Sequence, residues 1–254
     1  MIILKSQREI EKIRKSCQIV AEILMRLRER VTPGISSGEL NDLSEKWTAE
    51  YNAKPAFKGY HGFPYALCAS INEEVVHGMP SRERVLKEGD IISMDFGVVL
   101  DGYYGDAAIT VAVGEIGPVA LDLCKVTQQS LYKAIGQAVV GNRLSDISHA
   151  VQSHVEERGY SVVREFVGHG IGRQLHESPQ IPNYGAPGRG VKLKAGMVLA
   201  IEPMINQGRP EVEILADKWT AVTVDRGLSA HFEHTIAITD NGPDILSKMD
   251  DGVF

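Results

Sequence analysis

Residues 91–113 read IISMDFGVVLDGYYGDAAITVAV, two β-branched and apolar runs separated by a glycine-containing turn. Such runs around a short turn are typical of two antiparallel strands. Asp95 lies inside the first run, where an unpaired charge is costly to bury. Asp106 follows the turn, so a hairpin would bring the two carboxylates onto neighbouring strands within side-chain reach.

Two amphipathic helices are predicted before this hairpin. The first begins at a capping-box pattern, Ser6 with Glu9, and its apolar residues recur at helical spacing until Pro33-Gly34. The second begins at the same pattern, Ser36 with Glu39. The chain therefore opens with a helical part, at about residues 1–52.

The rest of the chain repeats this order, with helices before strands. Helices are predicted at 118–138, which opens with a proline, and at 142–158, which ends at a glycine. Strands are predicted at 161–167, 197–205, 219–224 and 231–239. This order favours an α+β fold of two similar halves. We expect one domain over residues 1–254, with no separate extension.

Composition excludes several classes of function. The chain has 254 residues, 43% of them apolar, and a net charge of −6. That charge supplies no long-range attraction to nucleic acid or to an anionic membrane. The three cysteines are far apart, and the charged N-terminus resembles neither a signal peptide nor a transmembrane helix. We expect a cytoplasmic protein with no nucleic-acid or membrane partner.

Four acidic residues lie in apolar runs that contain no lysine or arginine: Asp95, Asp106, Glu202 in MVLAIEPMI and Glu233 in SAHFEHTIAIT. Any one of them alone is explained more simply as a strand-end residue facing water. If all four converge, each pair at 4 Å repels by about 4 kcal/mol. Protonation or two divalent cations would relieve that repulsion. His169 is available as a fifth ligand for Mn, Fe, Co or Zn.

The segment FVGHGIGRQLHESPQ, residues 166–180, contains His169 and His176 among alternating glycines. Its spacing differs from G-x-G-x-x-G, and prolines follow where a helix should run, so a nucleotide-binding loop is excluded. His77, before a Gly-x-Pro turn, is suited to presenting its ring at a strand end. Four other histidines are expected to be ordinary surface or core residues: His61, His149, His154 and His234.

Taken together, these motifs resemble the type I methionine aminopeptidases of the pita-bread metallopeptidase fold. The resemblance rests on Asp95, Asp106, GHGIG, IEP and FEHT in this order, with VVHG and LHESP, and it covers essentially the whole chain. It implies a curved antiparallel β-sheet with outer helices and two pseudo-symmetric halves that meet at the active site.

The resemblance also implies a set of metal ligands. Asp95 would chelate one of two divalent ions, Asp106 and Glu233 would bridge both, and His169 and Glu202 would complete the other. The ions would be Co, Mn, Fe or Zn. A water between them would become a hydroxide that attacks the peptide carbonyl.

The catalytic roles implied are those of Glu202 as general base, His176 as hydrogen-bond donor to the carbonyl oxygen, and His77 as a contact of the scissile amide nitrogen. The implied pocket for the methionine side chain consists of Tyr60, Phe63, Cys68 and Trp219, although core packing would also explain apolar residues at these positions.

Three positions depart from the family pattern. Leu175 stands where an aromatic residue is usual, Phe57 where a small residue or cysteine is common, and His231 where glutamine usually precedes FEHT. The first two affect pocket shape. On one continuous strand, His231 and Glu233 would point to the same face, so His231 could perturb Glu233 or the metals.

The expected function is removal of the initiator methionine from nascent proteins and peptides when the second residue is small. We expect a monomer, and the ribosome is left open as a partner. Two alternatives remain: a same-fold aminopeptidase or X-Pro dipeptidase of different specificity, and a non-catalytic binding protein of this fold.

Overall fold

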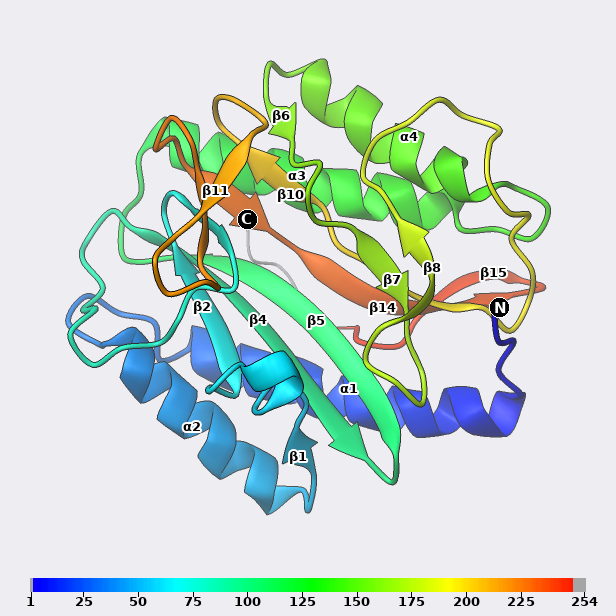
Figure 1. Ribbon diagram of the computed structural model, residues 1–254, viewed down its shortest axis with the longest axis horizontal. Coiled ribbons are helices and arrows are strands. Elements are labelled where there is room, and N and C mark those ends of the chain that lie inside the picture. The colour runs from blue at the N-terminus through cyan, green and yellow to red at the C-terminus, as the bar shows by residue number, and fades with distance from the viewer. Residues whose placement is uncertain (1, 249–254) are drawn as a thin grey trace.

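A nine-stranded antiparallel sheet curves through the centre of the molecule (Figure 1). The computed structural model describes residues 2–248. The main path of the sheet runs β1-β4-β5-β14-β9-β7-β8, with β2 paired to β4 and β15 paired to β14. Its strands are β1 (Lys54–Pro55), β2 (Leu67–Ile71), β4 (Ile91–Leu100), β5 (Tyr103–Ala112), β7 (Gly168–Gly170), β8 (Glu177–Ile181), β9 (Val198–Ile201), β14 (Glu233–Thr239) and β15 (Gly242–Ile245).

The predicted hairpin is confirmed as β4 and β5. Asp95 lies opposite Ala108, and Asp106 lies opposite Gly97. Because side chains alternate between the faces of a strand, this register places both aspartates on one face in diagonal positions. The hairpin therefore brings the two carboxylates together as the sequence predicts.

Two smaller sheets flank the large one. One has the order β13-β10-β6 and the other β11-β12-β3. Their strands are β3 (Glu74–Val76), β6 (Ser161–Val162), β10 (Met204–Asn206), β11 (Val212–Ile214), β12 (Ala221–Thr223) and β13 (Ser229–His231).

Within residues 2–248, four α-helices lie outside the sheet, in two pairs (Figure 1). They are α1 (Gln7–Arg28), α2 (Ser37–Glu50), α3 (Pro118–Gln137) and α4 (Leu144–Glu156). Helix α1 packs on β4 and β5, whereas α3 packs on α4 and contacts strands of the second half. The capping boxes at Ser6 and Ser36 are both formed. This arrangement confirms the predicted α+β fold with two similar halves.

Two strands predicted as continuous are broken, which corrects the sequence interpretation. The predicted strand 197–205 divides into β9 and β10 at Glu202-Pro203, because proline has no amide hydrogen to donate to a ladder. The predicted strand 231–239 divides into β13 and β14 at Phe232, whose amide donates to the carbonyl of Pro203. The chain thus passes between the large and a small sheet at two adjacent corners.

Strand β8 was not predicted, because its sequence contains Pro179. Proline is compatible with a strand at the edge of a sheet, and β8 is the last strand of the main path. The predicted strand 161–167 is also shorter than expected, and only β6 forms there.

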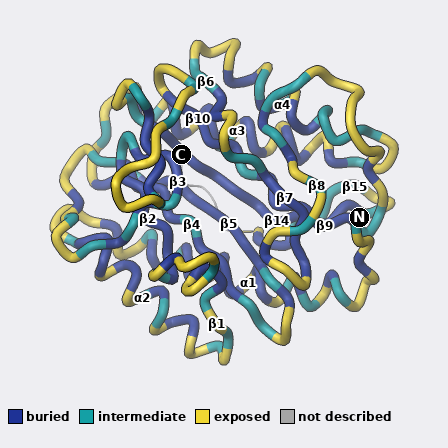
Figure 2. Tube along the Cα trace, viewed as in Figure 1, coloured by how far each residue is buried: buried dark blue, intermediate teal, exposed yellow. Residues whose placement is uncertain are grey.

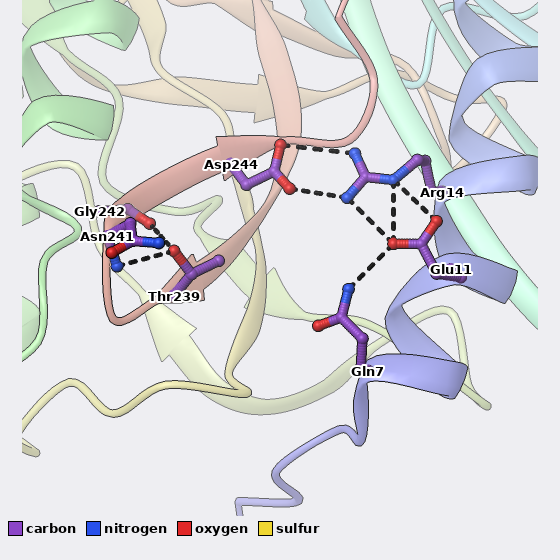
Figure 3. A network of polar contacts seen from close by, with 7 residues as sticks. All are labelled: Gln7, Glu11, Arg14, Thr239, Asn241, Gly242 and Asp244. Carbon is purple, nitrogen blue, oxygen red and sulfur yellow. Dashed lines mark hydrogen bonds and ion pairs between the residues drawn. The ribbon is translucent and has the colours of Figure 1, made fainter.

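The central strands are buried, whereas the outer turns are exposed (Figure 2). The main hydrophobic core lies between the sheet and the helices. Figure 3 shows how the first helix is tied to the last hairpin: Arg14 Nη2 donates to Asp244 Oδ2 at 2.6 Å, and the Arg14 guanidinium also contacts Glu11. Within residues 2–248, no helix is long and apolar enough to cross a membrane.

Candidate active site

One cavity of about 270 Å³ contains the side chains of all the predicted metal-binding, catalytic and pocket residues. It lies where the two halves meet, since its walls come from β4 and β5 of the first half and from β7 and β14 of the second. The predicted residues that line it are Tyr60, Phe63, Cys68, His77, Asp95, Asp106, His169, His176, Glu202, Glu233 and Trp219.

Register places three of the acids around one residue of the central strand. Ala108 on β5 lies between Asp95 on β4 and Glu233 on β14. Asp106 precedes Ala108 by two positions, so it points to the same face. The three carboxylates therefore project from neighbouring strands into the cavity.

Glu202 reaches the site from the corner between β9 and β10. At this corner the chain leaves the large sheet, so the direction of the Glu202 side chain is no longer set by the alternation of side chains along a strand. Glu202 Oε1 lies 3.5 Å from His169 Nε2. The proline that breaks the strand is thus part of what positions the fourth acid.

His169 on β7 presents one ring nitrogen to the acids. Its Nδ1 lies 2.9 Å from the carbonyl oxygen of Gly170 and donates to it, so Nε2 carries the lone pair of the neutral ring. Nε2 lies 3.9 Å from Asp106 Oδ2. Burial first, and His176 second, lower the pKa of His169 to about 3, so the ring is a neutral donor ready to bind a cation.

The glycines on either side of His169 are required by close packing. A side chain at Gly168 would collide with the carbonyl oxygen of Ala200 on β9. A side chain at Gly170 would collide with the carbonyl oxygen of Ser178 on β8. The GHG segment is therefore held tightly between two neighbouring strands, with the imidazole directed into the cavity.

Asp106 and Glu233 are buried and Asp95 and Glu202 are half-buried, and no positive charge among the residues that the structure describes compensates any of the four acids. Burial raises the pKa of Asp95 to about 7. Burial, followed by repulsion from neighbouring carboxylates, raises the pKa of Asp106, Glu202 and Glu233 well above its usual range. Within residues 2–248, no lysine or arginine forms an ion pair with any of them.

Three carboxylate oxygens of the site are left without a hydrogen-bond partner in the described part of the chain. Asp95 Oδ1, Asp106 Oδ1 and Glu233 Oε1 are buried and have no hydrogen-bond partner among the described residues. Ligand atoms of Asp106, His169 and Glu233 all lie within 4.8 Å of one another. Carboxylate oxygens with one imidazole nitrogen are a donor set that suits divalent transition metals. The residues present therefore fit a metal centre.

His176 and His77 line the same cavity as the carboxylates. The His176 ring contacts that of His169, with centroids 4.3 Å apart, and its Nδ1 lies 2.7 Å from Tyr60 Oη. His77 directly follows β3 with a positive φ of 59° and contacts Trp219 edge-to-face. Burial lowers the pKa of His77 to about 4, so this ring is also neutral.

The remaining wall of the cavity is apolar. Phe63 and Trp219 meet edge-to-face at 5.2 Å between centroids. Cys68 lies opposite Asp95 on the neighbouring strand β2, and burial raises the pKa of its thiol well above the usual range. Aromatic edges and a protonated thiol are suitable neighbours for a thioether.

The three positions that depart from the family pattern all lie at this site. Leu175 and Phe57 are buried and line the cavity. His231 is 1% exposed, and its Nε2 lies 3.8 Å from Glu202 Oε2. The strand break at Phe232 separates His231 from Glu233, so the expectation that the two residues share one strand is wrong. The acid that His231 approaches is Glu202.

Sequence reasoning missed several residues that line the cavity. His61, interpreted as an ordinary histidine, lies at its mouth together with Tyr60, and its positive φ of 48° reflects a tight turn between Gly59 and Gly62. The two flanking glycines were the signal for such a turn. The other missed lining residues are Val76, Phe166, Val167 and Met204.

Comparisons with known proteins agree with this geometry. Residues 11–240 match the model of metallopeptidase family M24. The methionine aminopeptidase of Clostridium acetobutylicum is 55% identical over 97% of this chain and 99% of its own length. Methionine aminopeptidase 1 of Bacillus subtilis is 53% identical over 98% of this chain and all of its own.

Solved structures show the same relationship. The crystal structure of methionine aminopeptidase from Thermotoga maritima is similar with a TM-score of 0.96 and 52% identity, covering 98% of this chain and 100% of that chain. The prolidase of Pyrococcus horikoshii has a TM-score of 0.80 and 27% identity, and only 66% of its length is covered. The chain therefore belongs to metallopeptidase family M24, among the methionine aminopeptidases.

Proposed function

We propose that this chain is a metal-dependent aminopeptidase that removes the initiator methionine from proteins and peptides whose second residue is small. The observation that carries the proposal is the cluster of four buried or half-buried acids without a protein cation, lining a cavity of about 270 Å³ whose remaining wall is apolar. The methionine aminopeptidase relatives, 55% identical in one case, support the substrate class.

Five residues are proposed to hold two divalent ions, of Co, Mn, Fe or Zn: Asp95, Asp106, His169, Glu202 and Glu233. Ions held there would supply Lewis acidity and lower the pKa of a water molecule between them. The buried oxygens without hydrogen-bond partners support this assignment, because two divalent cations would neutralise four carboxylates.

The chain's own residues then perform the remaining steps. Glu202, placed at the strand corner beside His169, accepts the proton of the attacking water and passes it to the leaving amine. His176 donates a hydrogen bond to the carbonyl oxygen as negative charge develops there. His77 contacts the scissile amide nitrogen, and the neutral state of its ring keeps positive charge away from the leaving amine.

The apolar wall determines which side chain enters. Tyr60, Phe63, Cys68 and Trp219 surround the space next to the carboxylates, and they exclude water from a bound thioether. The small volume of the cavity supports a preference for one unbranched apolar side chain. Since both halves contribute to this one site, we also propose that residues 1–254 act as a single catalytic domain.

The test is a peptide assay with defined metals. Met-Gly-Met should be cleaved after Mn, Co or Fe is added, and Met-Leu-Gly should be cleaved far more slowly. Activity that survives thorough chelation would exclude the metal mechanism. Equal cleavage of both peptides would exclude the proposed selectivity for a small second residue.

Two histidine variants separate the proposed roles. His169→Ala should weaken metal binding, whereas His176→Ala should lower kcat by about 100- to 1,000-fold with the metals still bound. Calorimetric titration with Mn measures the first effect, and steady-state kinetics measures the second. His149→Ala, an exposed position on α4, is the matched control.

A different specificity on the same chemistry is the second candidate. Leu175 and Phe57 alter the cavity wall relative to the usual family pattern, and the prolidase of Pyrococcus horikoshii is a structural neighbour. A tripeptide panel that varies the first residue, together with X-Pro dipeptides, distinguishes the two. A non-catalytic role would require that Glu202→Ala leaves biological activity unaltered. The nascent chain as substrate, a ribosome partner, the monomeric state and a cytoplasmic location stay predictions.

A further inference from the structure

Tyr60 connects the two halves of the molecule at the mouth of the cavity. It begins the 3-10 turn η1 (Tyr60–Gly62) of the first half, and its hydroxyl lies 2.7 Å from Nδ1 of His176 in the second half. The two ring centroids are 5.2 Å apart. The contact spans 116 positions of sequence, so the tertiary fold alone brings these residues together.

The loop around Tyr60 is closed by its own backbone. The amide of Tyr60 donates to the carbonyl of Phe57 at 2.9 Å, and the amide of Phe63 donates to the carbonyl of Tyr60 at 2.9 Å. Gly59 adopts φ 87°, which the turn requires and which glycine adopts without strain. The phenol is therefore presented from a short, internally bonded turn.

A neutral imidazole carries one N–H, and a hydrogen bond to one nitrogen decides where that proton resides. A phenolic O–H that donates to Nδ1 leaves the proton of His176 on Nε2. In the opposite arrangement Nδ1–H would donate to the phenol oxygen, and Nε2 would direct a lone pair into the cavity. Only the first arrangement leaves His176 able to donate to a substrate oxygen.

We propose that Tyr60 is a positioning residue that holds His176 in the tautomer with Nε2–H, in addition to lining the pocket. The inference rests on the proposed function, in which His176 donates to the substrate carbonyl. Through this hydrogen bond, Tyr60 in the first half of the molecule would help His176 stabilise the negative charge on the substrate oxygen. Lining the methionine pocket would not by itself require that role of Tyr60.

Tyr60→Phe tests the proposal because it removes the hydroxyl and retains the ring. We expect kcat for Met-Gly-Met to fall by about three- to tenfold, the effect of one hydrogen bond, with KM changed by less than about twofold. Mn affinity should be unchanged. Tyr65→Phe is the matched control, since Tyr65 lies nearby against Phe63 and its hydroxyl forms no hydrogen bond within residues 2–248.

A double-mutant cycle distinguishes positioning from wall packing. In a His176→Ala background, Tyr60→Phe should cause no further loss of kcat. A full additional loss in that background would overturn the proposal, as would a change confined to KM.

Nuclear magnetic resonance of ¹⁵N-histidine-labelled full chain, loaded with diamagnetic Zn²⁺, measures the tautomer directly and needs no turnover. The His176 signals should report Nε2–H in the wild type and a mixture in Tyr60→Phe. Nδ1–H in the wild type would overturn the inference. If the wild-type chain cleaves no methionine peptide, the proposed function fails. The tautomer measurement still decides the role of Tyr60 in that case.

Discussion

Glu177 and the four acids of the cavity are all buried or half-buried, yet they are accommodated in opposite ways. The side chain of Glu177 is 8% exposed and lies 2.5 Å from Lys5 Nζ, which is 4% exposed. Glu177 also accepts hydrogen bonds from the amides of Arg173 and Gln174. Its charge is therefore compensated entirely from within the chain.

The cavity acids have no such compensation. Their oxygens lack hydrogen-bond donors at three positions, and burial raises their pKa values. A second acid outside the cavity, Glu74, follows the pattern of Glu177, because it pairs with Arg84 and accepts from the amide of Ile71. Since this chain neutralises other buried acids with its own groups, the exception identifies the place reserved for a cation.

The largest effect is expected at the unpaired cluster. Asp106→Asn should lower kcat/KM by at least about 1,000-fold, because the several kcal/mol that bound metal supplies to the transition state is lost. At the same time the metal-free protein should unfold at a higher temperature, since one of four repelling carboxylates is removed. Steady-state kinetics measures the first effect, and thermal unfolding with and without Mn measures the second. A variant that keeps the full metal-induced stabilisation would remove Asp106 from the ligand set.

The paired acid should respond in the reverse manner. Lys5→Met leaves Glu177 buried without its cation and should reduce the free energy of unfolding by about 3 kcal/mol. Mn affinity should not change. Urea unfolding measures the loss, and the double variant Lys5→Met with Glu177→Gln should recover part of it. A loss below about 1 kcal/mol would show that the Lys5–Glu177 pair stabilises the protein no more than a surface ion pair does. It would then weaken the contrast between Glu177 and the cavity acids.

Acidity provides a third test of the contrast. A carboxyl with a raised folded pKa retains its proton until the pH exceeds that value, so metal binding must displace the proton. With the pKa of Asp95 at about 7, protonation of this one carboxyl should lower metal affinity by about fivefold between pH 7 and pH 6. Titration calorimetry in two buffers of different ionisation enthalpy counts the released protons. An affinity that is flat over this range would mean that the cluster is already ionised.

The smallest effect is expected on the surface. Arg14 and Asp244 form an ion pair with side chains 22% and 44% exposed (Figure 3). Arg14→Ala should reduce the free energy of unfolding by about 1 kcal/mol or less, and high salt should remove the difference. Parallel urea unfolding of this variant and of Lys5→Met compares an exposed with a buried ion pair in one protein. Equal losses would show that burial is not the deciding factor.

Much of the site could be predicted from local patterns. Acids within apolar strands, the turn between Asp95 and Asp106, and the capping boxes are encoded by residues close together in sequence. These patterns can be interpreted from three properties of short segments: the alternation of side chains on a strand, the cost of buried charge and the geometry of helix ends. The edge strand β8 was not predicted, because a local pattern that contains a proline does not indicate a strand and only the sheet shows that this segment lies at an edge.

The amino-acid sequence alone thus determined the fold class and the residues that gather at the centre. The tertiary structure decided how they meet: Glu202 turns in at a strand corner, His231 lies nearest to Glu202, and Tyr60 bonds His176. Lys5 reaches Glu177 across 172 positions of sequence. Local patterns follow from the conformational preferences of a few neighbouring residues, whereas these contacts exist only once packing has placed distant strands and loops side by side.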